Sequence, residues 1–326
     1  MSTQSPKAPV TVWDTATPTA MKAYGRELLA LAHERPEVVC LGADLTGPTE
    51  TDLFRDELPE RFFNIGMAEA NLMGVAAGMA RAGDLPYVNT FGVFASRRPL
   101  DQIAMQIAYP RTNVKIAGFM PGLTTPGGVT HQAIEDVAIM RALPGMTVVE
   151  PADATQIAQS VRAAAEWDGP VYLRLKRGET PVLEGLDVPF EIGRGQLLRE
   201  GGDALVLASG LMVTLALEAA AALAADGIEA AVGNVHTLKP LDRAFVLEHA
   251  ARAGAVVTAE NHTVIGGLGS AVADALVDEG VHVAFERVGI RDTFAYGASA
   301  PYLFRAHGLT AEAIADAVRR TVARRP

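Results

Sequence analysis

The chain alternates short β-branched runs with alanine-rich stretches of helical length, and this alternation constrains the fold more than any other feature. Strands separated by helices of about 10 to 15 residues are typical of βαβ units with parallel strands. We expect strands at residues 37–41, from 86, 113–117, 146–149 and 171–175, and helices at 68–81, 100–108, 133–143 and 154–165. Asp153 is the expected N-cap of the last helix, because its carboxylate can accept from the free amides of the first turn.

The alternation stops at residues 178–195, which are rich in Gly, Pro and acidic residues, and then resumes. In the second half we expect strands at 204–208, 230–235, 255–258 and 282–288, and helices at 212–225, 242–252, 269–278 and 310–323. The predicted fold is therefore two α/β domains with parallel sheets. The predicted boundaries are a mobile lead-in at 1–20, a first domain at 21–180, a linker at 181–195 and a second domain at 196–326.

The composition is that of a globular protein, with 49% hydrophobic and 20% charged residues in a chain of 326. The formal net charge of −10 argues against a protein that wraps nucleic acid. The single cysteine, Cys40, excludes an intramolecular disulfide and disfavours a Cys/His zinc site. No apolar run is long enough for a membrane span, and residues 1–14 lack the apolar core of a signal peptide. We expect a cytoplasmic protein without nucleic-acid or membrane partners.

Common catalytic signatures are missing: the sequence has no P-loop, no G-x-S-x-G elbow and no H-E-x-x-H motif. The glycine-rich stretch at 266–270 opens an expected helix and fits either a phosphate-binding turn or a plain loop–helix junction. Because it is not G-x-G-x-x-G, we favour the junction. A role beyond packing stays open for Cys40 and for residues 262–269.

Residues 61–98 and the following glycine-rich loop contain the candidate functional side chains. Glu69 begins an otherwise apolar helix, where a carboxylate could act chemically or only favour the helix N-terminus. Phe91 and Phe94 follow a strand three residues apart, a spacing found in cores as well as in ring platforms. His131 ends a loop before a helix, and the carboxyl edge of a parallel sheet is where sites form.

The order and wording of these motifs resemble the transketolase family of thiamine-diphosphate enzymes. RFFNIGMAEANLMGVAAGMA, YVNTFGVF and GGVTHQAIEDVAIMRALPGMTVVEPAD resemble its pyrimidine-binding domain. KPLDRAFVLEHAARAGAVVTAENHTVIGGLGSAVADAL resembles its third domain, which deoxyxylulose-phosphate synthases and the beta chains of 2-oxo acid dehydrogenases share. The resemblance covers residues 15–325 and is nearest to the C-terminal half of a split, two-subunit transketolase.

The resemblance implies roles for the candidate residues. Glu69 would be the catalytic carboxylate that hydrogen-bonds a pyrimidine nitrogen of thiamine diphosphate, and Phe91 and Phe94 would pack against the pyrimidine. His131 would be catalytic and would bind substrate hydroxyls. Arg97 and Arg177 would bind the anionic group of a sugar phosphate, although either arginine could equally be a solvated charge or a linker contact.

Two departures from the family pattern concern the substrate. Met120 stands where family members often carry His or Arg, and the loop at 125–132 is about one residue shorter than G-E-D-G-x-T-H-Q and lacks its acid. We therefore expect a donor and acceptor other than the usual pentose phosphates.

No G-D-G motif with a downstream Asn is present, and Gly83-Asp84-Leu85 is only its nearest approach. The resemblance then implies a partner subunit that holds Mg²⁺ and the diphosphate, an α2β2 assembly and no metal ligands in this chain. The alternatives are a dehydrogenase beta chain, an acyl-transferring relative of specialised metabolism, or a non-catalytic scaffolding homologue.

Overall fold

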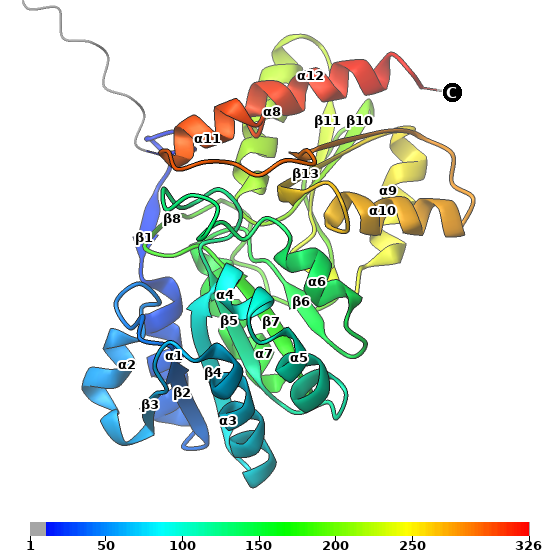
Figure 1. Cartoon of the computed structure of the whole chain (residues 1–326). Helices are drawn as coiled ribbons and strands as arrows, with labels where there is room; N and C mark the ends of the chain where they lie inside the picture. The colour runs from blue at the N-terminus through cyan, green and yellow to red at the C-terminus, as the bar shows by residue number, and fades with distance from the viewer. Residues whose placement is uncertain (1–10, 326) are drawn as a thin grey trace, which may run out of the picture.

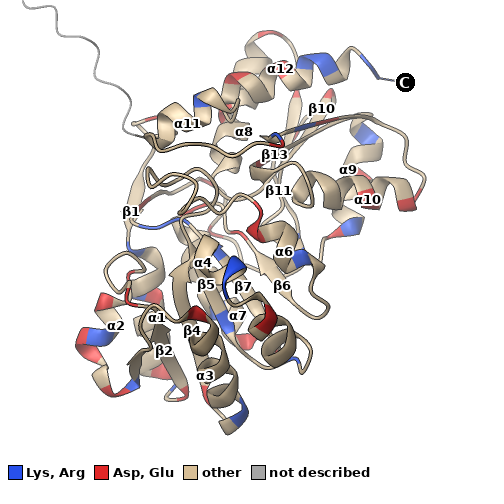
Figure 2. Cartoon of the chain, viewed as in Figure 1, with Lys and Arg blue, Asp and Glu red and all other residues tan. Residues whose placement is uncertain are grey.

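The computed structural model describes residues 11–325 and contains two α/β domains, one above the other in Figure 1. Residues 1–10, which are half of the expected lead-in, and residue 326 lie outside the described residues. Basic and acidic residues alternate along the ribbon of both domains in Figure 2, and the described residues form no continuous basic stretch of ribbon in that view.

The first domain is built on a seven-stranded sheet whose strands are all parallel except one edge strand. In spatial order the strands are β12 (Thr237–Lys239), β6 (Thr147–Val149), β7 (Val171–Leu175), β5 (Lys115–Phe119), β4 (Leu85–Phe91), β2 (Val38–Gly42) and β3 (Phe62–Asn64). The central strands β2, β4, β5 and β7 are buried along their whole length, as expected of a sheet covered on both faces.

Helices cover both faces of this sheet. They are α1 (Ala23–Glu34), α2 (Asp52–Glu57), the 3₁₀ turn η1 (Pro59–Arg61), α3 (Glu69–Ala82), α4 (Gly92–Arg97), α5 (Leu100–Gln102), the π-helical η2 (Ile103–Ala108), α6 (Asp136–Ala142) and α7 (Ala154–Glu166). α1 and α7 share one core cluster with β2 and β7, whereas α3, η2 and α6 share another with the opposite face. The Asp153 carboxylate accepts from the Gln156 amide at 2.7 Å, which confirms the predicted N-cap of α7.

The second domain has a five-stranded sheet in the order β14 (Ala284–Ile290), β13 (Ala255–Thr263), β10 (Ala204–Ala208), β11 (Ala230–Asn234) and β9 (Gln196–Arg199). Only β9 is antiparallel to its neighbour. The helices are α8 (Met212–Ala225), α9 (Arg243–Ala253), α10 (Leu268–Asp278), α11 (Ala300–Ala306) and α12 (Ala311–Val322). α8 and α12 pack together over one face, and α9 and α10 over the other.

The division of the chain into two domains does not coincide with the division of its strands into two sheets. β12 comes from the second half of the chain but pairs antiparallel with β6 of the first sheet. The Lys239 ammonium strengthens this attachment by donating to the carbonyls of Arg141 and Leu143 at 2.9 and 2.5 Å. Residues 182–195, within the expected linker, contain no helix or strand. The sequence pattern does not predict β12, because three residues are too few to show a period.

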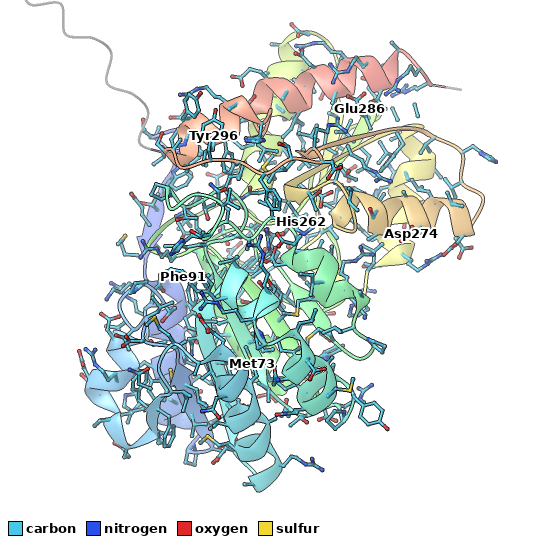
Figure 3. The ribbon with its side chains drawn as sticks, in the orientation of Figure 1. Met73, Phe91, His262, Asp274, Glu286 and Tyr296 are labelled. Atoms are coloured by element: carbon cyan, nitrogen blue, oxygen red, sulfur yellow. The ribbon has the colours of Figure 1, made fainter. Side chains whose placement is uncertain are left out.

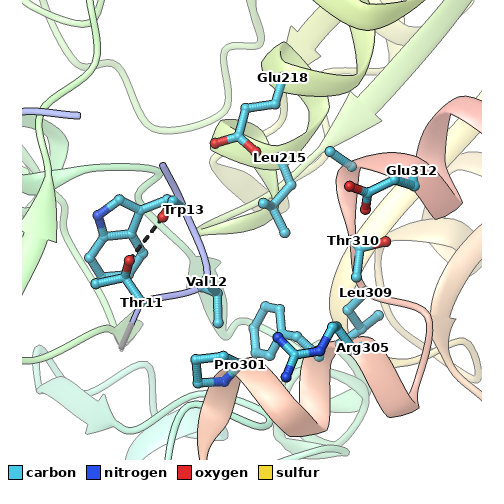
Figure 4. Close-up of a pocket in the computed structure, with 12 residues that line it drawn as sticks. Thr11, Val12, Trp13, Leu215, Glu218, Pro301, Arg305, Leu309, Thr310 and Glu312 are labelled. Carbon is cyan, nitrogen blue, oxygen red and sulfur yellow. Dashed lines mark hydrogen bonds between the residues drawn. The ribbon is translucent and has the colours of Figure 1, made fainter. Parts of the chain in front are cut away.

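Residues 11–21, which include the described half of the expected lead-in, contact both domains. Thr19–Met21 form β1, which pairs antiparallel with β8 (Glu179–Pro181). Trp13 is 8% exposed, and with Val12 it lines a cavity of about 250 Å³ against α11 and α8 of the second domain (Figure 4). These residues therefore tie the start of the first domain to the second.

Three predicted elements differ from those in the structure in helix type or by more than two residues at one end. The helix expected at 100–108 is α5 followed by a π-helical turn, and the helix expected at 133–143 begins only at Asp136. The strand expected at 255–258 continues to Thr263, because its polar residues Glu260 to His262 are buried rather than exposed. The sequence pattern predicts a loop for such a polar run, because the residues that bury it are distant in sequence.

Candidate active site

The candidate residues follow the carboxyl ends of neighbouring strands in the first sheet. Glu69 comes after β3, Phe91 ends β4, His131 lies in the loop after β5, and Arg177 comes after β7. Carboxyl ends of parallel strands share one edge of a sheet, which is where such folds bind ligands. The structure therefore places all these residues at a single edge, although it does not bring all of them into contact.

Phe91, Phe94 and His131 form one aromatic cluster. The phenyl rings are stacked, with centroids 5.8 Å apart and planes at 27°. The His131 ring lies 5.3 Å from the Phe94 ring, in an edge-on arrangement, and 6.1 Å from the Phe91 ring. Phe91 is buried and Phe94 only half-buried, so the pair extends from the core toward the surface.

Glu69 is a nearly buried carboxylate at the start of α3, with 3% of its surface exposed. Its Oε1 accepts from Arg98 Nη1 at 2.7 Å. The guanidinium carbon of Arg98 lies 4.1 Å from the centre of the Phe94 ring. Arg98 therefore bridges Glu69 and the aromatic cluster, and the sequence analysis did not identify it as a site residue. The signal was present in the adjacent pair of arginines after the phenylalanines.

The loop that carries His131 is tightly shaped. Met120, at its start, has φ of 60°, a left-handed conformation that favours glycine and must be held by its surroundings. The His131 amide donates to the Gly128 carbonyl at 2.9 Å, and Nδ1 lies 2.8 Å from Thr130 Oγ1. A Cβ at Gly127 would lie only 3.0 Å from His131 Cβ. The backbone thus folds closely around this histidine.

The two expected anion-binding arginines have different surroundings. Arg97 forms an ion pair with Glu135 just after the loop, so a carboxylate of this chain already faces its guanidinium. Arg177 is exposed, and no contact described for residues 11–325 connects it to Glu69 or to the aromatic cluster. The structure joins Glu69, Phe91, Phe94 and His131, and leaves both arginines outside that group.

A buried ionic network lies beneath the site. Arg174 is fully buried in β7 and pairs with Asp136 at 2.9 Å and with Glu150 at 2.5 Å. Tyr172 also donates to Asp136, at 2.7 Å. Burial raises the pKa of Asp136, but the charge of Arg174 and the hydrogen bonds from Arg174 and Tyr172 act in the opposite direction, and the pKa lies below its ordinary value. An arginine inside the apolar run VYLRL was the sequence signal for this network.

His262 extends the network into the second domain and lies near the middle of the molecule in Figure 3. Its Nε2 accepts from the Ala138 amide at 3.3 Å and lies 4.0 Å from Asp136. Burial, with the nearby charge of Arg174, lowers the pKa of His262 to about 4. The imidazole is therefore neutral at pH 7 and acts as a hydrogen-bonding link between the domains.

The glycine-rich stretch at 266–270 is a loop–helix junction. The first amides of α10, those of Leu268 and Gly269, both donate to the buried Glu260 carboxylate, at 2.8 and 2.9 Å. Burial raises the pKa of Glu260 to about 7, although these two hydrogen bonds act in the opposite direction. Because Glu260 occupies the amides, the structure gives no support to the phosphate-binding alternative.

Three other features are placed by the structure. Cys40 is buried in β2, where burial raises its pKa and Asn89 Nδ2 lies 3.3 Å from its sulfur. Gly83 ends α3 just before β4 begins, so Gly83-Asp84-Leu85 lies at the opposite edge of the sheet from the site. Within residues 11–325, no group of three His, Cys, Asp or Glu side chains is arranged to hold a metal. No described helix is long and apolar enough to cross a membrane.

Comparison with known families matches both domains. Residues 16–182 match the transketolase pyrimidine-binding domain, and residues 193–314 match the transketolase C-terminal domain. An uncharacterised transketolase family protein of Sinorhizobium fredii is 47% identical over 93% of this chain and 88% of its own length. The 6-deoxy-6-sulfo-D-fructose transketolase subunit SqwH of a Clostridium strain is 46% identical over 91% of this chain and 92% of its own.

Two further relatives differ in length, one being about twice as long as this chain and the other about equal to it. The 1-deoxy-D-xylulose-5-phosphate synthase of Heliobacterium modesticaldum is 36% identical over 93% of this chain, which corresponds to only 47% of the synthase. A solved structure described as a split gene transketolase, inactive beta4 tetramer, has 47% identity and a TM-score of 0.87, covering 94% of this chain and 98% of that one. These matches confirm the predicted resemblance and the predicted pair of parallel-sheet domains.

Proposed function

The chain belongs to the transketolase family, and on this premise we propose that it is the beta-type subunit of a thiamine-diphosphate-dependent enzyme that transfers a two-carbon ketol unit from a ketose to an aldose. The observation that carries the proposal is the nearly buried Glu69 carboxylate, joined through Arg98 to the aromatic cluster of Phe91, Phe94 and His131. A scaffolding homologue would have no need of a carboxylate in this position.

The chemistry of these groups fits the pyrimidine half of thiamine diphosphate. Phe91 and Phe94 offer a stacked aromatic surface for a flat ring. Glu69 offers a carboxylate shielded from water, where a hydrogen bond is stronger than at the surface. When bound, thiamine diphosphate supplies the nucleophilic carbon and the electron sink for breaking a carbon–carbon bond beside a carbonyl.

Each residue then has a defined task. Glu69 would hold a proton at a ring nitrogen of the pyrimidine, and Phe91 and Phe94 would fix the plane of that ring. His131, in contact with Phe94, would bind substrate hydroxyls near the reacting carbon and move a proton there. Arg97 and Arg177 would bind the anionic end of the substrate, and for Arg97 this means competing with Glu135.

The substrate is expected to differ from the usual pentose phosphate pair, because the loop before His131 lacks an acidic residue. One relative is named for 6-deoxy-6-sulfo-D-fructose, whose sulfonate is an anion of the kind that an arginine binds. We therefore include sulfonated and phosphorylated ketoses among the candidate donors.

A partner subunit would complete the site. The described residues offer no metal-holding cluster, while the diphosphate of the cofactor needs Mg²⁺. One relative is named as a subunit, and the similar solved structure is described as an inactive tetramer of beta chains. Both are in keeping with an α2β2 enzyme whose other subunit, carrying the G-D-G motif, binds Mg²⁺ and the diphosphate.

The test is reconstitution. The chain is purified alone and together with a diphosphate-binding subunit, and both samples receive thiamine diphosphate and Mg²⁺. Donors would include xylulose 5-phosphate and 6-deoxy-6-sulfo-D-fructose, with a panel of aldose acceptors. We expect two-carbon transfer by the complex and none by the chain alone.

Other outcomes would point elsewhere. Full activity of the chain alone would refute the need for a partner, and ordinary rates with xylulose 5-phosphate and ribose 5-phosphate would refute the altered substrate choice. Oxidative decarboxylation of a 2-oxo acid, or acyl transfer, would favour the alternative enzyme classes. A stable complex without any of these activities would favour a scaffolding role.

A further inference from the structure

The loop at residues 121–133, here called the His131 loop, is closed at its base by its own backbone. The Gly122 amide donates to the Ala133 carbonyl at 2.8 Å, and Pro121 forms an isolated parallel bridge with Ala133. The base alone fixes where the loop starts and ends. Its tilt relative to the aromatic cluster must be fixed by something outside the loop.

Asn261 of β13, in the second domain, makes an external contact at the start of the loop, while near its end Gln132 Nε2 donates to the Tyr296 carbonyl at 3.1 Å. The Asn261 side chain is 2% exposed and bonds the loop on both sides of Gly122: Oδ1 accepts from the Leu123 amide at 3.0 Å, and Nδ2 donates to the Pro121 carbonyl at 3.1 Å. A primary amide has one acceptor and one donor side, so it satisfies both backbone groups at once.

The loop and Asn261 are so close together that no side chain fits at Gly122. Gly122 has φ of 53°, and a Cβ there would lie 2.2 Å from both the carbonyl oxygen and the Oδ1 of Asn261. Only glycine permits this approach. The backbone of the loop is thus seated directly on the second domain.

Asn261 is itself held in place by the buried network. Arg174 Nη2 donates to the Asn261 carbonyl at 3.0 Å and to the Ala133 carbonyl at 2.9 Å. One guanidinium therefore fixes both the end of the His131 loop and the residue that grips its start. A second-domain backbone contact, from the Thr263 amide to the Ile134 carbonyl at 2.8 Å, continues the same seam.

We propose that Asn261 is a positioning residue that sets the placement of His131 by holding the His131 loop against the second domain. The proposal rests on the proposed function for its link to catalysis, because His131 is a substrate-binding residue only there. The second domain, which contributes none of the candidate catalytic residues, thereby becomes part of the machinery that orients one of them.

The experiment compares Asn261→Ala and Asn261→Asp with Asn234→Ala. Asn234 is a matched control, because it is fully buried in the same domain and its Nδ2 bonds Gln156 and Gln196 at 3.0 and 3.1 Å instead of the loop. Hydrogen–deuterium exchange of the full chain is followed over residues 121–133. We expect Asn261→Ala to speed exchange there about tenfold or more, with no such change in Asn234→Ala.

Asn261→Asp separates the two hydrogen bonds and serves if Asn261→Ala does not fold. It keeps an acceptor for the Leu123 amide but turns an oxygen toward the Pro121 carbonyl. We expect the Leu123 amide to stay protected while exchange at Gly122 rises. Unchanged exchange in both Asn261 variants would overturn the proposal.

Kinetics of the reconstituted complex tests the link to His131. With the donor found by the screen, we expect Asn261→Ala to lower kcat/KM for the donor about tenfold or more, with the thiamine diphosphate requirement unchanged. An effect no larger than that of Asn234→Ala would overturn the positioning role. If no donor is active, the proposed function fails, while the exchange measurement still decides whether Asn261 holds the loop.

Discussion

Arg98 donates to the Glu69 carboxylate across 2.7 Å, and the two partners differ sharply in exposure: the arginine side chain is 51% exposed and the glutamate side chain only 3%. The buried carboxylate is therefore reached by a side chain that extends in from solvent. Such a pair contributes little to folding. The pair matters because of its position. The Arg98 guanidinium lies over the Phe94 ring, at the edge of the sheet that holds the candidate residues.

Replacing Glu69 by Gln should remove activity without unfolding the protein. Glutamine has nearly the same shape, and its side-chain oxygen can still accept a hydrogen bond from Arg98, but its amide carries no negative charge. We expect kcat of the reconstituted complex to fall by about 100-fold or more, while the unfolding free energy changes by less than about 1 kcal/mol. Glu37→Gln is the control, because Glu37 pairs with Arg35 at the opposite edge of the sheet. Near-normal turnover in Glu69→Gln would show that this carboxylate is not catalytic.

Breaking the buried network at Arg174 should destabilise the chain strongly. Arg174→Met leaves Asp136 and Glu150 as buried charges without a counter-charge, so we expect a loss of about 3 to 5 kcal/mol in the unfolding free energy. Urea denaturation followed by circular dichroism measures it. Arg319→Met is the control: Arg319 pairs with Asp226 and Asp316 at the surface, where water screens the charges, so its loss should leave the stability nearly unchanged. Equal effects of the two substitutions would contradict this account.

His262 should lower the stability of the chain as the pH drops below about 6.5, whereas Glu260, whose pKa burial raises to about 7, should act in the opposite direction. The pKa of His262 is about 4 when folded and about 6.5 when unfolded, so between these values the unfolded chain binds the extra proton. The stabilisation is complete above pH 6.5 and is lost toward pH 4, by at most about 3 kcal/mol. Asp136, Glu260 and Arg174 are the charged groups around this imidazole.

Urea denaturation at pH 7.5, 6 and 5 checks this dependence. We expect the unfolding free energy of His262→Gln, relative to that of the unsubstituted chain, to rise as the pH falls from 7.5 to 5. His282→Gln, which alters an exposed histidine, should show no such pH-dependent difference. The same slope for all three chains would mean that other groups cause the pH dependence.

A fragment that ends at residue 195 should not fold like the first domain of the full chain. It lacks β12, so β6 becomes an open edge, and the carbonyls that Lys239 caps lose their donor. We expect the fragment to aggregate or to unfold without a cooperative transition, whereas the full chain unfolds in one. Solubility and thermal unfolding by circular dichroism compare them. Cooperative unfolding of the fragment at the temperature of the full chain would count against a structural role for β12.

Local pattern was sufficient for most of the architecture. The alternation of strands and helices predicted both sheets, and Asp153 predicted the start of α7, because these features depend on neighbours within a few residues. β12 was not predictable, since its partner β6 lies almost ninety residues earlier and its three residues show no period. The polar end of β13 was missed for a similar reason, because its burial depends on the other domain.

The residues of the candidate site also fall into two groups, those that the sequence predicts and those that only the fold shows. Glu69, Phe91, Phe94 and His131 were named through resemblance to a family, and the structure brings them together. Arg98 and Asn261 depend on contacts that only the fold creates: Asn261 and Leu123 are 138 residues apart in sequence. Arg177 is the opposite case. Its sequence motif predicts a place in the site, whereas none of its described contacts connects it to the other site residues.

The pairing of β12 with the first sheet also limits how this chain could be recombined with its relatives. A chimera joined within residues 182–195 would give the first sheet an edge strand of foreign origin, and that strand would have to match β6 in register and Arg141 and Leu143 in position. A crossover after Lys239 would keep the sheet intact but would divide the second domain after β11. A working chimera would therefore have to take both domains from one parent, or match β12 to β6 across the join.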